Sequence, residues 1–169
     1  MSAAPAEALA RAIAAEFRRR MLDEYVPRIE RCVRMLGHAE LWHRENARSN
    51  SIGNLLLHLE GNVRQWVLAG LGGIGDGRDR AAEFAASGAA TAASATLLRR
   101  LRETVAESCD IVDRLSAGDM LATRTFQRKF AETGVGAVLH VLEHFSGHAG
   151  QIYAATKQMR AVDLAHYDL

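Results

Sequence analysis

Apolar residues recur at helical spacing in four long parts of the chain. In residues 6–36 an apolar residue falls at every fourth position, which produces one apolar stripe along a helix: Leu9, Ile13, Phe17, Met21, Tyr25, Ile29 and Val33. Pro27 lies inside this pattern. Because proline lacks a backbone donor and its ring crowds the preceding turn, we expect the helix to kink or divide near Glu24.

Residues 50–71 and residues 94–115 carry the second and third helical patterns. We expect Ser49 or Asn50 to cap the second helix, and a run of glycines to end it. Residues 72–93 are rich in Gly, Ala and Ser, which predicts a long connection with one helical turn at residues 80–84. The third helix is indicated by apolar and small residues at helical spacing: Leu97, Leu101, Val105, Ser108, Val112 and Leu115.

The fourth helix is expected over residues 133–159. The residues before it, 122–130, alternate in character and fit a short extended piece, whereas residues 162–169 have no assigned structure. Long amphipathic helices without a framework of strands favour an all-α fold. The chain is therefore predicted to form a four-helix bundle, with residues 1–169 as one domain.

Uncharged polar residues follow one side of the second and fourth predicted helices. On the fourth, His140, His144 and His148 are spaced four apart and therefore share one face. The second helix carries a matching stripe: Asn50, Asn54, His58, Asn62 and Gln65. Asparagine is a poor helix former, because its side chain competes for backbone hydrogen bonds. We interpret the two stripes as facing each other across a pocket.

Histidines at this spacing are candidate metal ligands. Two histidines four residues apart on a helix can hold one metal ion, and neutral imidazole suits Zn, Ni, Fe and Cu. The outer two of the three lie about 12 Å apart along the axis, so either His140 with His144 or His144 with His148 fits. His58 would be the third ligand, leaving a position open for water or substrate, as in catalytic sites. The alternative is an interfacial stripe in which each ring is satisfied by a hydrogen bond.

No general base is identified from the sequence. Phe145 stands where HExxH metalloproteases carry glutamate, which argues against proteolysis of that kind. Glu60 and Glu143 are near the histidines in sequence, but each points away from its neighbouring histidine on the helix. Three arginines are candidates for binding an anionic substrate group, although solvation at the surface is the simpler explanation for them: Arg44, Arg64 and Arg78.

Composition and charge limit the classes of partner that we expect and the compartment in which the protein is expected to lie. The formal net charge is +1, without the basic excess of a nucleic-acid-binding protein. Cys32 and Cys109 lack metal-binding spacing, so we expect reduced, buried thiols. The sequence shows neither a signal peptide nor about 20 consecutive apolar residues. We therefore predict a cytoplasmic protein with no nucleic-acid or membrane partner.

Two stretches resemble the DinB-like (DinB/YfiT-like) superfamily of metal-dependent proteins. They are residues 49–66, SNSIGNLLLHLEGNVRQW, and residues 143–157, EHFSGHAGQIYAATK. The HxxxHxGQ pattern and the single upstream histidine are hallmarks of that superfamily. Residues 78–84, RDRAAEF, are similar to one uncharacterised branch of it.

The resemblance implies a four-helix bundle whose metal ligands are His58, His144 and His148, with His140 as a neighbour in the pocket. It also implies a divalent metal ion (Zn, Ni or Fe, with Zn favoured) and a small-molecule substrate. The expected protein is a homodimeric enzyme that activates water or a low-molecular-weight thiol, similar to the S-transferases or hydrolases of the superfamily. The alternatives are a non-catalytic metal- or ligand-binding module and a helical protein held together by a structural metal.

Overall fold

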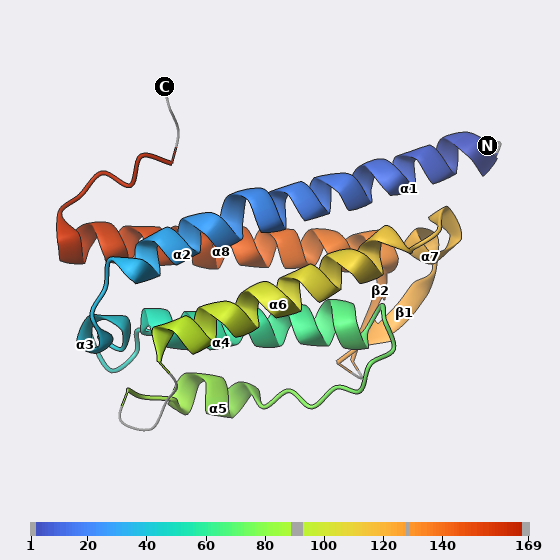
Figure 1. Cartoon of the computed structure of the whole chain (residues 1–169). Helices are drawn as coiled ribbons and strands as arrows, with labels where there is room; N and C mark the ends of the chain where they lie inside the picture. Colours follow the sequence, from blue (N-terminus) through green and yellow to red (C-terminus); the bar gives the residue numbers. More distant parts are fainter. Residues whose placement is uncertain (1–2, 89–92, 128, 167–169) are drawn as a thin grey trace.

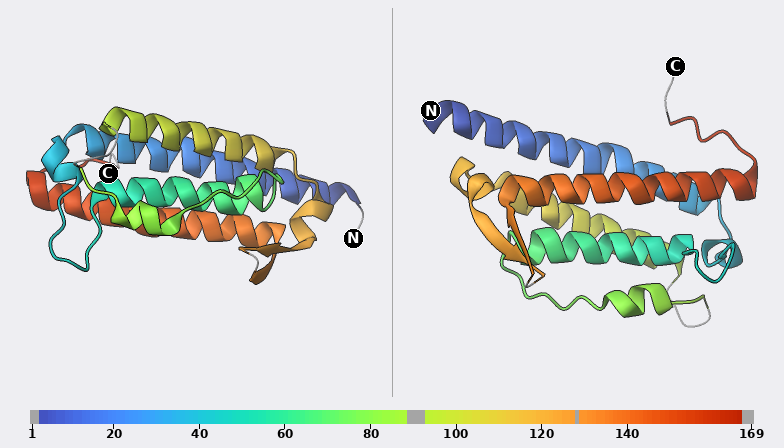
Figure 2. Two further views of the ribbon diagram at one scale, coloured as in Figure 1. Left: turned by 90° about the horizontal axis from the view of Figure 1, so that it is seen from below. Right: turned by 180° about the vertical axis from the view of Figure 1, so that it is seen from behind.

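The computed structural model describes residues 3–88, 93–127 and 129–166, and these residues are mostly helical. Four long helical segments lie side by side (Figure 1, Figure 2). The segments are α1 (Ala3–Arg18) with the π-helical turn η1 (Arg19–Tyr25) and α2 (Val26–Arg34); α4 (Ile52–Val63) with the π-helical turn η2 (Arg64–Ala69); α6 (Ser94–Asp113); and α8 (Gly134–Arg160). The helical prediction is thereby confirmed.

Shorter elements connect the long segments: α3 (His38–Leu41), α5 (Arg80–Ala85), α7 (Ala117–Leu121), β1 (Thr123–Phe126) and β2 (Phe130–Thr133). The two strands pair antiparallel, with Thr123 opposite Thr133 and Phe126 opposite Phe130. This hairpin lies at the end of the molecule where α8 begins (Figure 1). It confirms the extended piece expected in residues 122–130 and adds a return strand that the helical prediction did not include.

The interruption predicted at Pro27 is present. Pro27 lies at the start of α2 directly after η1, and the helical backbone continues through Tyr25 and Val26, whose N–H donates to the Met21 oxygen five residues back. The turn before it, η1, is π-helical and ends at Tyr25. A wider turn of this kind is a common cause of helix kinks, and here it makes room for the proline ring.

The N-terminal cap of α4 lies one or two residues later in the chain than predicted, so this prediction is wrong. Ser51, not Ser49 or Asn50, caps the helix, because its Oγ accepts a hydrogen bond from the Asn54 backbone N–H at 3.1 Å. The Asn54 side chain accepts in return from the Ser51 backbone N–H at 3.1 Å. This reciprocal arrangement satisfies two donors at the helix start.

The path of the chain places α5 beside the middle of α4. Helices α4 and α8 run in opposite directions, and the connection after η2 turns back along the outer side of α4 (Figure 1, Figure 2). Helix α5 lies on this returning connection and packs on α4, while α8 packs on α4 as well. Residues in the middle of α4, His58 among them, can therefore meet both α5 and α8.

The core contains apolar side chains from all four long segments, and the largest fully buried ones include Phe17, Met21, Ile29, Leu59, Leu101, Phe145 and Ile152. Cys32 and Cys109 are free and buried, as predicted. Burial raises the pKa of the Cys109 thiol to about 12, so it stays protonated and unreactive. None of the described helices has the length and apolar character needed to cross a membrane.

Candidate metal centre

Three histidines from two helices converge on one point. His58 on α4 and His144 and His148 on α8 each offer one ring nitrogen, and the three nitrogens lie within 4.8 Å of one another. The Nε2 atoms of His58 and His144 are 3.0 Å apart. At a zinc–nitrogen distance of about 2.0–2.1 Å, two ligands of a tetrahedral ion are about 3.3 Å apart. The observed separations between ring nitrogens, from 3.0 Å up to 4.8 Å, lie on both sides of that value. The three residues therefore fit a single ion after small side-chain movements.

His140 lies one turn before His144 and outside this group. Its ring packs on Trp66, with ring centroids 3.9 Å apart, and its centroid is 5.7 Å from that of His144. Helical spacing left two possible pairs on α8. The structure brings His144 and His148, not His140, next to His58.

The histidines of α8 are held in the neutral form that binds metal. Burial, together with the nearby His148, His58, His140 and Arg78, lowers the pKa of His144 to about 3. Burial also lowers the pKa of His148, although its hydrogen bond to Gln151 opposes the shift. Metal ions compete with protons for imidazole, so rings that are neutral at physiological pH bind a cation without first losing a proton.

Glu83 on α5 fixes the orientation of His58. The Nδ1–H of His58 donates to Oε2 of Glu83 at 2.8 Å, which leaves Nε2 unprotonated and directed at His144. A carboxylate behind a histidine commonly sets the tautomer of a metal-binding ring and raises its basicity. Glu83 was not among the residues selected from the sequence. The available signal was the RDRAAEF segment, residues 78–84, which had been noted only for its resemblance.

Arg78 keeps the Glu83 carboxylate charged. It donates to Oε1 through Nε at 2.7 Å and to Oε2 through Nη2 at 2.9 Å. Burial raises the pKa of Glu83, but the hydrogen bonds from Arg78 and His58 outweigh it, and the net shift is downward. Nη2 of Arg78 also lies 3.0 Å from Nδ1 of His58. Both atoms donate to the same Oε2, so this contact is not itself a hydrogen bond.

Residues of the two polar stripes predicted from the sequence make different kinds of contact in the structure. Nδ2 of Asn54 donates to the backbone oxygens of Glu83 and Ala86 at 2.9 Å each, and so attaches α5 to α4. Oε1 of Gln151 accepts from Nδ1 of His148 at 3.1 Å, which leaves Nε2 of that ring for the centre. Asn54 thus acts on His58 through α5, whereas Gln151 orients a ring directly.

A cavity of about 590 Å³ opens beside His58 and His144. Its volume is in the range of sites that bind small organic molecules. The rest of its wall comes from α4, α5, α8, the hairpin and the segment before α5: Asn62, Trp66, Arg78, Arg80, Gln127, Lys129, Phe130, Ala131, Glu132 and His140. The histidine centre therefore faces a space large enough for a substrate.

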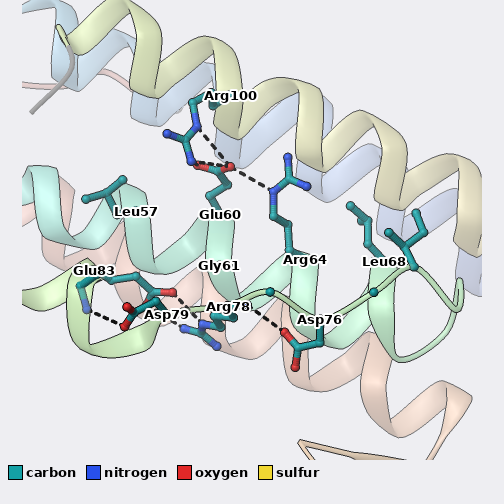
Figure 3. Close-up of a pocket in the computed structure, with 14 residues that line it drawn as sticks. Leu57, Glu60, Gly61, Arg64, Leu68, Asp76, Arg78, Asp79, Glu83 and Arg100 are labelled. Atoms are coloured by element: carbon teal, nitrogen blue, oxygen red, sulfur yellow. Dashed lines mark hydrogen bonds and ion pairs between the residues drawn. The ribbon is translucent and has the colours of Figure 1, made fainter.

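A second cavity, of about 420 Å³, is also lined by Arg78, together with Glu83 and residues of α4 and α6. Figure 3 shows Glu60 extending from α4 toward Arg64 and Arg100, away from α5. Oε1 of Glu60 accepts from Arg64 Nε and Arg100 Nη2, both at 3.1 Å. Glu60 therefore points away from the histidines, as predicted, and its charge is paired with the two arginines within this second cavity.

Gly61 lets the Arg78–Glu83 pair approach α4 (Figure 3). A Cβ atom at Gly61 would overlap Oε1 of Glu83 and lie 2.9 Å from Nε of Arg78. We expect Gly61→Ala to displace Glu83 from His58 and to weaken zinc binding about tenfold or more, with helical content unchanged. Competition with a chromophoric chelator measures this affinity. Gly150→Ala on α8 is the control, since a Cβ there meets nothing within 4 Å. Unchanged affinity in Gly61→Ala would contradict the expectation.

The fold and the centre define a mostly helical protein with three histidines placed to hold one metal ion. The chain belongs to the family described as "Protein of unknown function (DUF1572)", whose model matches residues 11–167, including all three histidines. Neither a curated protein nor a solved structure matches the sequence.

Proposed function

We propose that this protein is a metal-dependent enzyme of the DinB-like superfamily, with the four-helix-bundle fold of that group. His58, His144 and His148 would hold one divalent cation. The observation that carries the proposal is the convergence of three ring nitrogens, from two helices, within 4.8 Å of one another. An all-imidazole set suits Zn, Ni or Fe, and three ligands near tetrahedral spacing favour Zn.

Three protein ligands leave a position for a water molecule or a small thiol. A cation bound there supplies Lewis acidity, which favours the ionised, nucleophilic form of either molecule. The residues of the chain orient the rings: Glu83 holds His58, and Gln151 holds His148. Cys32 and Cys109 are buried in the core, so a reacting thiol would come from a cosubstrate.

Two features favour catalysis over a purely structural metal. His58 and His144 border a cavity of about 590 Å³, whereas a structural zinc site is closed by four protein ligands. The core of large apolar side chains also extends along all four long segments, so the fold has a source of stability besides the metal. A non-catalytic ligand-binding module is the second candidate, since it would have the same cavity. A homodimer and a cytoplasmic location stay predictions from the sequence.

The test begins with elemental analysis of the purified protein. We expect about one metal ion per chain, mostly zinc, that a chelator removes while the helical circular dichroism persists. Protein that releases its metal only on unfolding would favour the structural role. Failure to bind added Zn²⁺, Ni²⁺ or Fe²⁺ would overturn the proposal.

The activity test compares the metal-loaded and chelated protein. Conjugation of an electrophile such as 1-chloro-2,4-dinitrobenzene to cysteine or glutathione reports S-transfer, and cleavage of 4-nitrophenyl acetate reports hydrolysis. We expect one of these rates to depend on the metal and to return when zinc is added back. Metal binding without either reaction would favour the non-catalytic module.

A further inference from the structure

Two cationic side chains from separate parts of the chain line the cavity beside His58 and His144. Arg80 is the first residue of α5, and Lys129 lies in the turn between β1 and β2. Both belong to the wall of the cavity of about 590 Å³. Within residues 3–88, 93–127 and 129–166, neither has a carboxylate partner within 4.0 Å.

Aromatic rings position both cations without occupying their hydrogen-bond donors. Cζ of Arg80 lies 4.9 Å from the centroid of the Phe84 ring, and that ring is 4.7 Å from the His58 ring. Nζ of Lys129 lies 5.5 Å from the centroid of Phe130. Such contacts use the face of the ring, so the N–H groups remain available for an anion.

The arginines selected from the sequence as anion-binding candidates are engaged elsewhere. Arg44 donates to Oδ1 of Asn54, Arg64 to Glu60, and Arg78 to Glu83. The contact of Arg44 attaches the segment after α3 to α4, and Arg64 and Arg78 neutralise buried carboxylates. Recognition of an anion beside the histidines therefore falls to Arg80 and Lys129.

The remaining charges of the described cavity wall cancel these two cations only in part. Arg78 is neutralised by Glu83. Oε1 of Glu132 accepts from the backbone N–H of Thr133 at 2.8 Å, beside the N-terminus of α8, where the helix dipole stabilises its charge. Glu132 therefore offsets one of the two positive charges of Arg80 and Lys129, and the described wall keeps a net charge of +1, which favours an anionic ligand.

Aromatic side chains also line the cavity. The Trp66 ring contacts the rings of His140 and Phe126, with centroid distances of 3.9 Å and 4.8 Å. Phe130 is 45% exposed, unusually open for a phenylalanine. A ligand body that covers this wall would be apolar or aromatic, because such a body gains most from contact with rings.

We infer that the cavity binds a small organic anion. Its aromatic or apolar body lies against Trp66 and Phe130, and its carboxylate or phosphate is bound by Arg80 and Lys129. Recognition of the anion does not require the metal. The reacting part of the ligand would be directed at His58 and His144, and only this last point rests on the proposed function.

Binding of three matched compounds tests the inference. Phenylacetate and phenyl phosphate are anions, and 2-phenylethanol is a neutral molecule of similar size. Isothermal titration of the zinc-loaded and chelated protein measures their affinities. We expect at least one anion to bind about tenfold or more tightly than the alcohol, with or without zinc. The more tightly bound anion identifies the group as carboxylate or phosphate.

The Arg80→Gln/Lys129→Gln double variant should weaken binding of that anion about tenfold or more. Its affinity for 2-phenylethanol and its zinc content should equal those of the unaltered protein. Arg11→Gln/Lys157→Gln removes the same charge from residues that do not line the cavity, and it should bind the anion normally. This control separates local recognition from the effect of net charge.

The outcomes separate this inference from the proposed metal site. An anion bound equally well by the Arg80→Gln/Lys129→Gln variant overturns the inference, while normal zinc content leaves the metal site in place. Anion binding that is lost in chelated protein and in His58→Ala also overturns it, because the anion would then bind the metal. Anion binding that depends on Arg80 and Lys129 in a protein without zinc affinity supports the inference and contradicts the metal site.

Discussion

Replacing His58 by alanine is expected to reduce the zinc content from about one ion per chain to less than about a tenth. The remaining ligands, His144 and His148, belong to a single helix and would have to hold the ion as a pair. The helical circular dichroism should persist, because α4 and α8 also pack through apolar residues such as Leu59 and Phe145. Elemental analysis after gel filtration measures the change.

Variants of α8 show which pair of histidines takes part. His148→Ala should lose the ion as His58→Ala does, whereas His140→Ala should retain about one ion per chain. His140 is a close control, since it lies on the same helix and packs on Trp66 beside the same cavity. Full retention by His58→Ala would remove the basis of the proposed site. Loss of the ion in His140→Ala but not in His148→Ala would assign the ligands to the other pair.

Glu83→Gln is expected to weaken zinc binding about 10- to 100-fold, because a neutral amide no longer fixes the tautomer and the orientation of the His58 ring. The variant should also lower the free energy of unfolding by about 3 kcal/mol. The reason is that Arg78, whose side chain is only 4% exposed, would lose its charged partner. Competition with a chelator measures the affinity, and urea denaturation of the metal-free protein measures the stability.

Glu60→Gln is the matched control for this prediction. Glu60 is also a buried carboxylate paired with arginines, but it faces α6 and the second cavity (Figure 3). Since Arg64 and Arg100 are about half exposed, the loss of stability should be near 1 kcal/mol. Zinc affinity should not change. Equal weakening of zinc binding in both variants would attribute the effect to general destabilisation, not to the contact with His58.

The sequence predicted the long helices because each one buries a stripe that recurs with the helical period. The stripe of the first helix marks Phe17, Met21 and Ile29 correctly as core residues. Leu9 belongs to the same stripe but is 59% exposed. The period identifies the face of a helix on which a residue lies, but not whether a neighbouring helix extends far enough to cover it. That depends on how the long segments are offset along their axes.

The helical period is likewise insufficient to identify the histidines that form the candidate metal centre. Spacing on the fourth predicted helix treats His140 and His148 alike, and only the axial offset between α4 and α8 distinguishes them. Helical spacing alone could not select Glu83, because its contact with His58 depends on the path of residues 72–93. The composition of that connection has no period from which a path can be derived. Pairing of β1 with β2 is likewise a contact between separate segments, so the hairpin wall of the cavity was not foreseen.

Helix α5 is held on α4 by a few polar contacts, those of Asn54, Arg78 and Glu83, and the long helices pack without it. The properties of the centre can therefore diverge among relatives through changes in one short surface segment. Substitutions in α5 would alter the orientation of the His58 ring or the charge of the cavity wall, and they would leave the apolar core intact.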